Sequence, residues 1–239
     1  MSILVVTGTG TGVGKTVVTA ALAALARARG AAVAVVKPAQ TGVADGESGD
    51  VDEVIRLAGV STTFELARFP APLPPAAAAR ASGRPPVSQA RAAELISELA
   101  ESNRLVVVEG TGGLLDRYDD DGATVADLAR TLRAQVLVVA RPGGDTVNHT
   151  ALTLEALAHR GLDLAGIVIG RWPVRPGLAE CGSVADLEML AARPLAGALP
   201  EGAGSLGGGR EFTEVARLGL GVTLGGSFDP AGFRDHHSL

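Results

Sequence analysis

The sequence has only one cysteine, Cys181, among its 239 residues, so one chain cannot form an internal disulfide. It has no apolar run near the roughly 18 residues that cross a membrane. The N-terminus lacks the charged start and small-residue cleavage site of a secretory signal. Lysine and arginine form no block, and the formal net charge is −5. These absences predict a cytoplasmic protein and argue against a nucleic-acid or membrane partner.

Histidine and lysine are also scarce. The four histidines and the cysteine show no metal-binding spacing, and no G-x-S-x-G sequence accompanies a catalytic triad. Among 21 basic residues only Lys15 and Lys37 are lysines, which partly reflects a composition biased toward arginine. A chain that uses arginine elsewhere retains lysine where a compact point charge is needed. Both lysines are therefore functional candidates.

Short β-branched runs alternate with alanine- and leucine-rich segments along the chain. Strands are predicted at 2–7, 31–38, 104–110, 134–142 and 163–172, and weaker ones at 195–199 and 220–224. Helices are predicted at about 14–29, 50–59, 87–101, 122–133, 146–160, 178–192 and 210–218, and loops at 69–75 and 201–210. The alternation predicts an α/β fold, a doubly wound, mainly parallel sheet with helices on both faces. Since no linker or repeat is visible, we interpret residues 1–239 as one domain.

A glycine-rich stretch, TGTGTGVGKT (7–16), follows the first predicted strand. The common phosphate loop reads G-x-x-x-x-G-K-[ST]; Gly14, Lys15 and Thr16 match its end, but its first glycine would fall on Thr9. A strand, a glycine-rich turn, Gly-Lys-Thr and a helix still direct backbone N–H groups and a helix N-terminus toward phosphates. We therefore interpret this stretch as a phosphate loop of unusual length that begins at Gly8.

Charged residues follow the second and third strands, where ligands of such sheets bind. Lys37 would be a solvated surface residue in isolation, but beside a phosphate loop we expect it to bind ligand. Glu109 ends a strand before several glycines, as the second metal-binding carboxylate of a phosphate-loop enzyme does; pairing with an arginine is the alternative. Asp50 and Asp52 open a predicted helix, and the sequence leaves open whether they cap it or whether one binds Mg²⁺.

The segment after the fourth strand begins the helix predicted at 146–160. Asp145 or Thr146 is placed to cap this helix, whose free N–H groups would form an anion site. Asn148 and His149 lie in its first turn. From the residues alone, ordinary capping and a surface histidine are the better interpretation.

Taken together, these motifs resemble the dethiobiotin synthetase family, biotin-pathway ligases of the phosphate-loop NTPase superfamily. Residues 8–16 fit that family's G-T-x-T-x-V-G-K-T, with five residues between the glycines, and residues 37–42 fit K-P-x-x-[ST]-G. Residues 106–113 fit V-x-V-E-G-x-G-G, and residues 148–153 fit N-H-T-x-L-T. The likeness runs in order through the chain, strongly to about residue 170 and weakly beyond it.

The resemblance implies that 7,8-diaminopelargonate, CO₂ and a nucleoside triphosphate (ATP or another) give dethiobiotin through a carbamate and a carbamic-phosphoric anhydride. It implies that Lys37, Lys15 and Thr11 are catalytic. It implies that Thr16, Asp50 and Glu109 hold Mg²⁺. The nucleotide would contact Gly12, Val13, Gly14, Lys15, Thr16, Val17, Gly170, Arg171, Pro200, Glu201 and Gly202. The substrate would contact Thr41, Gly112 and Gly113, together with Thr146, Val147 and Asn148 of the partner subunit in a homodimer whose site lies at the interface.

The sequence departs from the family pattern at three places. Gly10 and Gly12 replace residues that are often acidic, which makes the loop more pliable. Asp145 stands where a glycine is common and could repel a substrate carboxylate unless it caps the helix. Members that select adenine usually have an asparagine after the strand at 163–172, where this chain has Gly170 and Arg171. We therefore hypothesise weak selectivity for the base.

The main alternative is an ATPase switch of the partition or septum-placement type, which shares this fold. Its signature lysine would fall at Gly10, and the chain has no lysine to supply it. A regulatory GTPase would need N-K-x-D, and a cobyrinate-type synthetase would need a glutaminase domain that this chain has no length for. A catalytically inactive binding module would not need Lys37, Glu109 and Thr16 together.

Overall fold

A seven-stranded parallel sheet forms the centre of the protein in the computed structural model, which describes residues 2–238. In spatial order its strands are β4 (Thr62–Glu65), β2 (Val33–Lys37), β6 (Leu105–Gly113), β1 (Ser2–Gly8), β7 (Gln135–Ala140), β8 (Leu164–Trp172) and β9 (Gly197–Pro200). Every neighbouring pair in this sheet is parallel. A two-stranded parallel ladder joins β3 (Gln40–Thr41) to β5 (Arg68–Phe69) beside it.

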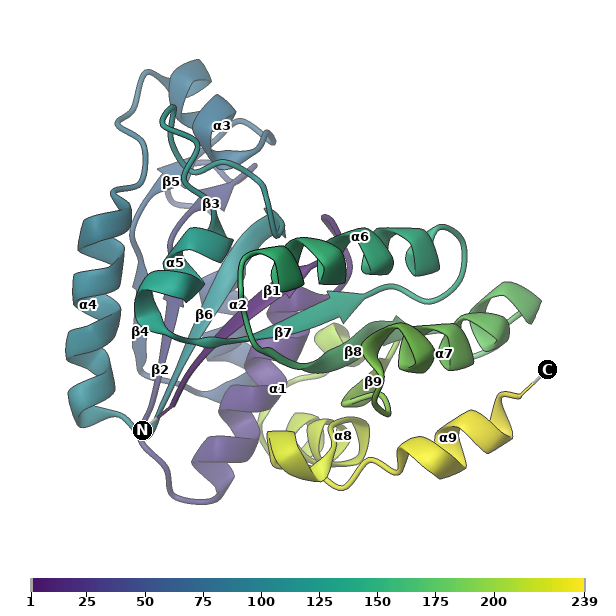
Figure 1. Cartoon of the computed structure of the whole chain (residues 1–239). Helices are drawn as coiled ribbons and strands as arrows, with labels where there is room; N and C mark the ends of the chain where they lie inside the picture. Colours follow the sequence, from purple (N-terminus) through teal and green to yellow (C-terminus); the bar gives the residue numbers. More distant parts are fainter. Residues whose placement is uncertain (1, 239) are drawn as a thin grey trace.

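Helices cover both faces of the sheet (Figure 1). One face carries α1 (Lys15–Ala28), α2 (Asp50–Ala58) and α8 (Gly209–Gly219). The other carries α4 (Gln89–Ser102), α5 (Val125–Leu132), α6 (Thr146–His159) and α7 (Leu178–Ala191). This arrangement confirms the predicted doubly wound α/β fold. Among residues 2–238, no helix combines the length and apolar character that crossing a membrane would require.

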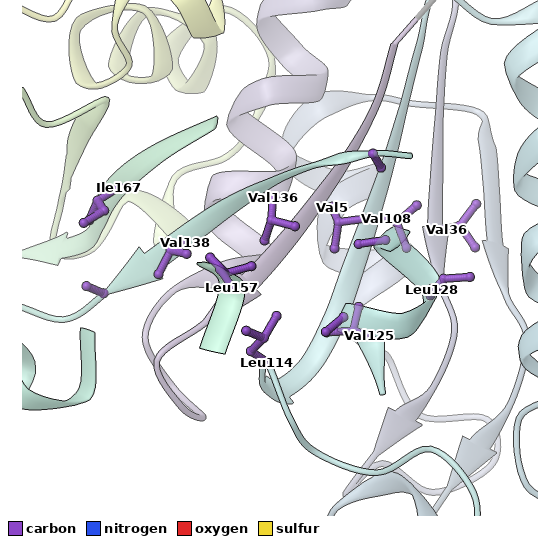
Figure 2. Close-up of a cluster of buried hydrophobic side chains, with 14 of the residues drawn as sticks. Val5, Val36, Val108, Leu114, Val125, Leu128, Val136, Val138, Leu157 and Ile167 are labelled. Atoms are coloured by element: carbon purple, nitrogen blue, oxygen red, sulfur yellow. The ribbon is translucent and has the colours of Figure 1, made fainter. Parts of the chain in front are cut away.

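Pleating of the strands divides the core into two hydrophobic layers. Val5, Val108 and Val136 point toward α5 and α6, where Leu128 and Leu157 cover them (Figure 2). Their strand neighbours Val6, Val107 and Leu137 point to the opposite layer, with Val18 of α1 and Phe212 of α8. Successive side chains of a strand alternate between faces, so continuously apolar strands such as VVV (106–108) must be buried on both sides.

The sequence prediction missed the two-residue strands β3 and β5, the turn η1 (Ala203–Ser205) and three longer elements, and one predicted strand was wrong. The chain forms β4, α3 (Pro75–Ser82) and α9 (Pro230–His236) where no element was expected. Both helices begin at a proline, which suits the first helical position although proline usually indicates a loop. Residues 220–224 form no strand: they contain the 3-10 turn η2 (Val222–Leu224) and one isolated bridge from Leu220 to Gly197. Gly225, at φ +100°, ends that turn in the left-handed region.

Candidate active site

A cavity of about 520 Å³ opens where the strands of the parallel sheet end. The C-terminal ends of β2, β6, β8 and β9 and the segments that follow β1, β2 and β9 all contribute to its wall. The cavity brings together predicted site residues from the whole chain: Thr11, Gly12, Gly14, Lys15, Thr16, Val17, Lys37, Thr41, Asp50, Glu109, Gly112, Gly170, Arg171, Pro200 and Gly202. Ligand binding at the carboxyl edge of a parallel sheet is the general pattern for such folds.

The glycine-rich loop connects β1 to α1 along this wall. Gly14 has a left-handed backbone, φ +102°, directly before the first residue of α1. A Cβ on Gly14 would lie 2.7 Å from the carbonyl oxygen of Gly170, and one on Gly170 would lie 2.1 Å from that of Val13. The loop therefore lies directly against β8, and glycine is required on both sides. Val13 is buried beneath the loop, outside the cavity lining.

Lys15 points back across its own loop. Its Nζ donates to the carbonyl oxygen of Gly10 at 2.9 Å. Burial and the nearby Lys37 ammonium lower the pKa of Lys15 from its ordinary value to about 8, although Glu109 and Asp50 partly oppose the shift. The protein thus holds a desolvated cation beside the helix N-terminus, an arrangement that favours an incoming phosphate.

Lys37 lies between two carboxylates at the base of the cavity. Its Nζ is 2.6 Å from Oδ2 of Asp50 and 2.8 Å from Oε1 of Glu109, and its side chain is only 2% exposed. Burial alone would lower the pKa of Lys37, but the two carboxylates outweigh it and raise that pKa above its ordinary value. Glu109 pairs with this lysine and with the Thr16 hydroxyl, 2.8 Å away, rather than with an arginine.

The structure separates the two aspartates that the sequence left undecided. Asp52 caps its helix: its Oδ2 accepts from the Gly49 N–H at 2.8 Å. The Asp50 carboxylate instead faces the cavity, where it pairs with Lys37. The backbone N–H of Asp50 donates to Oε1 of Gln40 at 2.9 Å. Burial would raise the pKa of Asp50, but the Lys37 ammonium, with Lys15 and the Thr16 hydroxyl, holds it below its usual value. Asp50 is therefore ionised at neutral pH.

The oxygen donors at the base of the cavity have the chemistry that Mg²⁺ prefers. Two carboxylates, Asp50 and Glu109, approach the Thr16 hydroxyl beside the phosphate loop. Within residues 2–238 no cluster of three or more His, Cys, Asp or Glu side chains could hold a metal. Mg²⁺ does not need such a cluster, because it commonly takes one or two carboxylates and fills its remaining positions with phosphate oxygens and water.

Several residues of the site were missed by the sequence analysis. Gln40 lines the cavity and holds the first N–H of α2. Thr111 also lines it, and its hydroxyl donates to the carbonyl oxygen of Ala39, which ties β6 to the end of β2. The Tyr118 hydroxyl accepts from the Thr111 N–H at 3.0 Å. Gln40 and Thr111 occupy variable positions of the motifs quoted above, so only their place beside the fixed residues could have indicated them.

The predicted carboxylate-binding residues lie outside this cavity. Thr146, Val147 and Asn148 form the first turn of α6. The Asp145 side chain makes no capping hydrogen bond there, although Asp145 occupies the cap position. Gly113 lines a separate recess of about 310 Å³ with residues of α6, including His149 and Leu152. Glu201 also lies outside the lining of the main cavity, between Pro200 and Gly202, which line it; its carboxylate is 3.6 Å from the Arg171 guanidinium.

The parallel sheet, the glycine-rich loop into α1 and the lysine–carboxylate cluster define a phosphate-loop nucleotide-binding protein. The family described as an AAA domain matches residues 2–205. An ATP-dependent dethiobiotin synthetase BioD of Parafrankia sp. is 60% identical over 239 residues, covering 100% of both chains. Its namesakes in Frankia casuarinae and Streptomyces coelicolor are 62% and 52% identical, covering 98% and 99% of each chain. The chain belongs to the dethiobiotin synthetase family.

Solved structures support the fold at lower identity. Chloroplast FtsY from Physcomitrella patens aligns with 99% of this chain and 65% of its own, at a TM-score of 0.55 and 19% identity. The septum site-determining protein MinD from Pyrococcus horikoshii, complexed with Mg-ADP, aligns with 90% of this chain and 94% of its own, at a TM-score of 0.54 and 18% identity. At such identities the likeness concerns the fold alone.

Proposed function

We propose that this protein is a biotin-biosynthesis ligase that makes dethiobiotin from 7,8-diaminopelargonate, CO₂ and ATP. Membership of the family supports the reaction. The observation that best supports this reaction in the cavity is the position of Lys37, a buried ammonium held between two carboxylates beside a phosphate loop. Phosphoryl transfer needs positioning and charge neutralisation more than covalent catalysis, and these groups provide both.

The reaction divides into three balanced steps. One substrate amine attacks CO₂, forms a C–N bond and loses a proton, giving a carbamate. A carbamate oxygen then attacks the γ-phosphorus, and the bond from that phosphorus to the bridging oxygen of ADP breaks. The second amine attacks the carbonyl carbon of the resulting anhydride, expels phosphate and loses a proton as the ureido ring closes. Each step gathers negative charge on oxygen, which the lysines at the cavity base would stabilise.

At the phosphate end of the cavity, different side chains would bind the phosphates, the carbamate and Mg²⁺. Lys15 would neutralise the β- and γ-phosphates, and Lys37 would neutralise the carbamate and its phosphorylated form. Thr11 and Thr41 would donate hydrogen bonds to the carbamate and phosphates. Mg²⁺ would be held by Thr16, Asp50 and Glu109, and when bound it supplies further charge for the phosphate oxygens. Gly112 would place its backbone against the substrate, as would Gly113 nearby.

The substrate carboxylate would bind in a homodimer, to the first turn of α6 in Thr146, Val147 and Asn148 of the partner subunit. Two features support this assignment. The Oγ1 atom of Thr146 is buried and has no hydrogen-bond partner within residues 2–238. Leu115 and Leu152, at the recess beside α6, are 44% and 57% exposed, as apolar side chains of an uncovered subunit interface are. An anion at a helix N-terminus is favoured by its free N–H groups.

The nucleoside would occupy the other end of the cavity, between Gly170 and Arg171 on one side and Pro200 to Gly202 on the other. Gly170 lacks a side chain, and the Arg171 guanidinium lies 3.6 Å from the Glu201 carboxylate. Among residues 2–238, no asparagine amide lines the cavity to read an adenine edge. We therefore retain the hypothesis that the base is held by backbone and stacking, with weak selectivity.

The alternative function, an ATPase switch, differs from a ligase in when phosphate is released. A ligase should release phosphate only when the diamine is present, whereas a switch hydrolyses ATP without it. The test incubates purified protein with ATP, Mg²⁺ and bicarbonate, and measures phosphate with and without 7,8-diaminopelargonate. We expect release to depend on the diamine. Diamine-independent hydrolysis at a comparable rate would favour the switch.

A further inference from the structure

The nucleoside end of the cavity is formed by a loop with few internal hydrogen bonds. Residues 202–205, Gly-Ala-Gly-Ser, line the cavity and include the 3-10 turn η1 (Ala203–Ser205). The Ser205 N–H donates to the Gly202 carbonyl at 2.8 Å, but the Leu206 N–H reaches the Ala203 carbonyl only at 3.4 Å. Glycine-rich backbone is costly to order, so contacts from outside the loop must hold it.

Arg56 of α2 supplies such contacts. Its Nη2 donates to the carbonyl oxygen of Gly204, and its Nη1 donates to that of Leu206 at 2.5 Å. The planar guanidinium presents its donors as a rigid fork, so one side chain fixes two carbonyls that are two residues apart. These bonds join α2 to a segment 148 and 150 positions further along the chain.

Glu53 fixes the orientation of that guanidinium. Its Oε2 accepts from Nε of Arg56 at 2.8 Å, and its Oε1 accepts from Nη2 at 2.5 Å. The Arg56 and Glu53 side chains are 41% and 33% exposed, and a pair this exposed adds little stability by itself. The pair instead fixes the position of the guanidinium, which therefore stays within hydrogen-bond distance of the two carbonyls.

The loop also packs closely on the helices that carry the phosphate site. A Cβ on Gly204 would lie 3.0 Å from Val17 of α1. One on Gly208, at φ +84°, would lie 2.2 Å from the carbonyl oxygen of Arg56. At its other end α2 begins with Asp50, which pairs with Lys37, and about 9 Å of helix rise separates Asp50 from Arg56. One helix therefore supports both ends of the cavity.

We propose that Arg56 is a positioning residue for the nucleoside part of the triphosphate. It lies behind the wall formed by residues 202–205, outside the cavity lining, and holds the backbone against which base and ribose would bind. The inference rests on the proposed function, because it requires a nucleoside triphosphate in this cavity. Loss of Arg56 should then weaken binding of a nucleotide but spare binding of a triphosphate that has no nucleoside.

The test compares ATP with inorganic tripolyphosphate, each in the presence of Mg²⁺, by calorimetric titration of wild type and Arg56→Ala. Arg130→Ala is the matched control: Arg130 pairs with Asp127 three residues earlier, at 3.0 Å, but in the part of the chain that the structure describes it has no hydrogen bond to a distant loop. In Arg56→Ala we expect the Kd of ATP to rise roughly tenfold and that of tripolyphosphate to stay unchanged. Arg130→Ala should change neither.

Arg56→Lys provides a second variant should Arg56→Ala fail to fold. A lysine keeps the charge but lacks the fork, so we expect a smaller increase in the Kd of ATP and again none for tripolyphosphate. Equal weakening of both ligands, or an unchanged Kd for ATP, would overturn the role of Arg56. A wild-type protein that binds tripolyphosphate and ATP equally poorly would instead overturn the proposed function, and this inference with it.

Discussion

The ammonium of Lys37 lies 2.8 Å from the carboxylate of Glu109, and both side chains are only 2% exposed. A buried ion pair of this kind is costly to separate, because the partner that remains is an unpaired charge with little access to water. Here the remaining charge would be doubled, since Asp50 pairs with the same ammonium at 2.6 Å. The group proposed to neutralise the carbamate is thus also a structural cation.

Lys37→Ala should therefore lose both activity and stability. Without the ammonium, the carboxylates of Asp50 and Glu109 would face each other in the cavity unpaired. We expect ring closure to be abolished and the free energy of unfolding to fall by about 3–5 kcal/mol. Mg²⁺ should restore part of that loss by replacing the missing charge. Denaturant titrations with and without Mg²⁺ test this, and unchanged turnover would remove the assigned role of Lys37.

ATP binding should weaken above pH 8. Phosphates favour the charged form of Lys15, whose pKa is about 8 in the free protein. Below that pH the charge is already present, so the Kd should be nearly flat. Above it, binding requires proton uptake, and the Kd should rise by up to about tenfold per pH unit. Titrations of ATP from pH 7 to 9.5 measure this.

Lys15→Arg is the control for that pH dependence. A guanidinium stays charged throughout this range, so its profile should be flat even if its affinity is lower. A wild-type profile without any change near pH 8, or an equal change in Lys15→Arg, would contradict the role of the buried ammonium.

Gly170→Ala should damage the site although it adds a single methyl group. Its Cβ would lie 2.1 Å from the carbonyl oxygen of Val13, so either β8 or the phosphate loop must move. We expect stability to fall by about 1–3 kcal/mol and ATP affinity to fall with it. Gly10→Ala is the matched control, because nothing lies within 4 Å of its added Cβ. Thermal unfolding and ATP titration of both variants measure these two effects. Equal stability and equal ATP affinity in the two variants would contradict the close packing of the loop on β8.

The hypothesis of weak base selectivity predicts that ATP, CTP, GTP and UTP support ring closure with kcat/KM values within about tenfold of one another. Backbone and stacking contacts discriminate less than buried hydrogen-bonding side chains do. Equimolar mixtures of the four triphosphates, with the diphosphate products separated by chromatography, measure the preference directly. A strong preference for ATP would show that the base is read by groups other than an asparagine.

Much of the site could be predicted from the sequence because its residues lie in local motifs at strand ends. A strand followed by glycines and a charged residue identifies both the element and the edge of the sheet to which it leads. Lys15, Lys37 and Glu109 could therefore be placed together before their separation was known. The fold class followed similarly from runs such as VVV (106–108), which are apolar on both faces.

The remainder depends on contacts that sequence spacing does not reveal. Nothing in the acidic stretch 45–54 shows that Asp52 caps the helix while Asp50 pairs with Lys37; the choice follows from how α2 meets β2. Arg56 reads as a surface arginine until the loop near Gly204 is placed beside it. Residues 220–224 are apolar enough for a strand, but the glycines around them permit a tight turn instead.

We expect this cavity to join CO₂ to a diamine with energy from a triphosphate. Mass spectrometry of the product formed from 7,8-diaminopelargonate, ATP, Mg²⁺ and ¹³C-bicarbonate tests this reaction. The product should be dethiobiotin carrying the label in its ureido carbon, with one phosphate released per molecule formed. Phosphate release without a labelled cyclic product would contradict it.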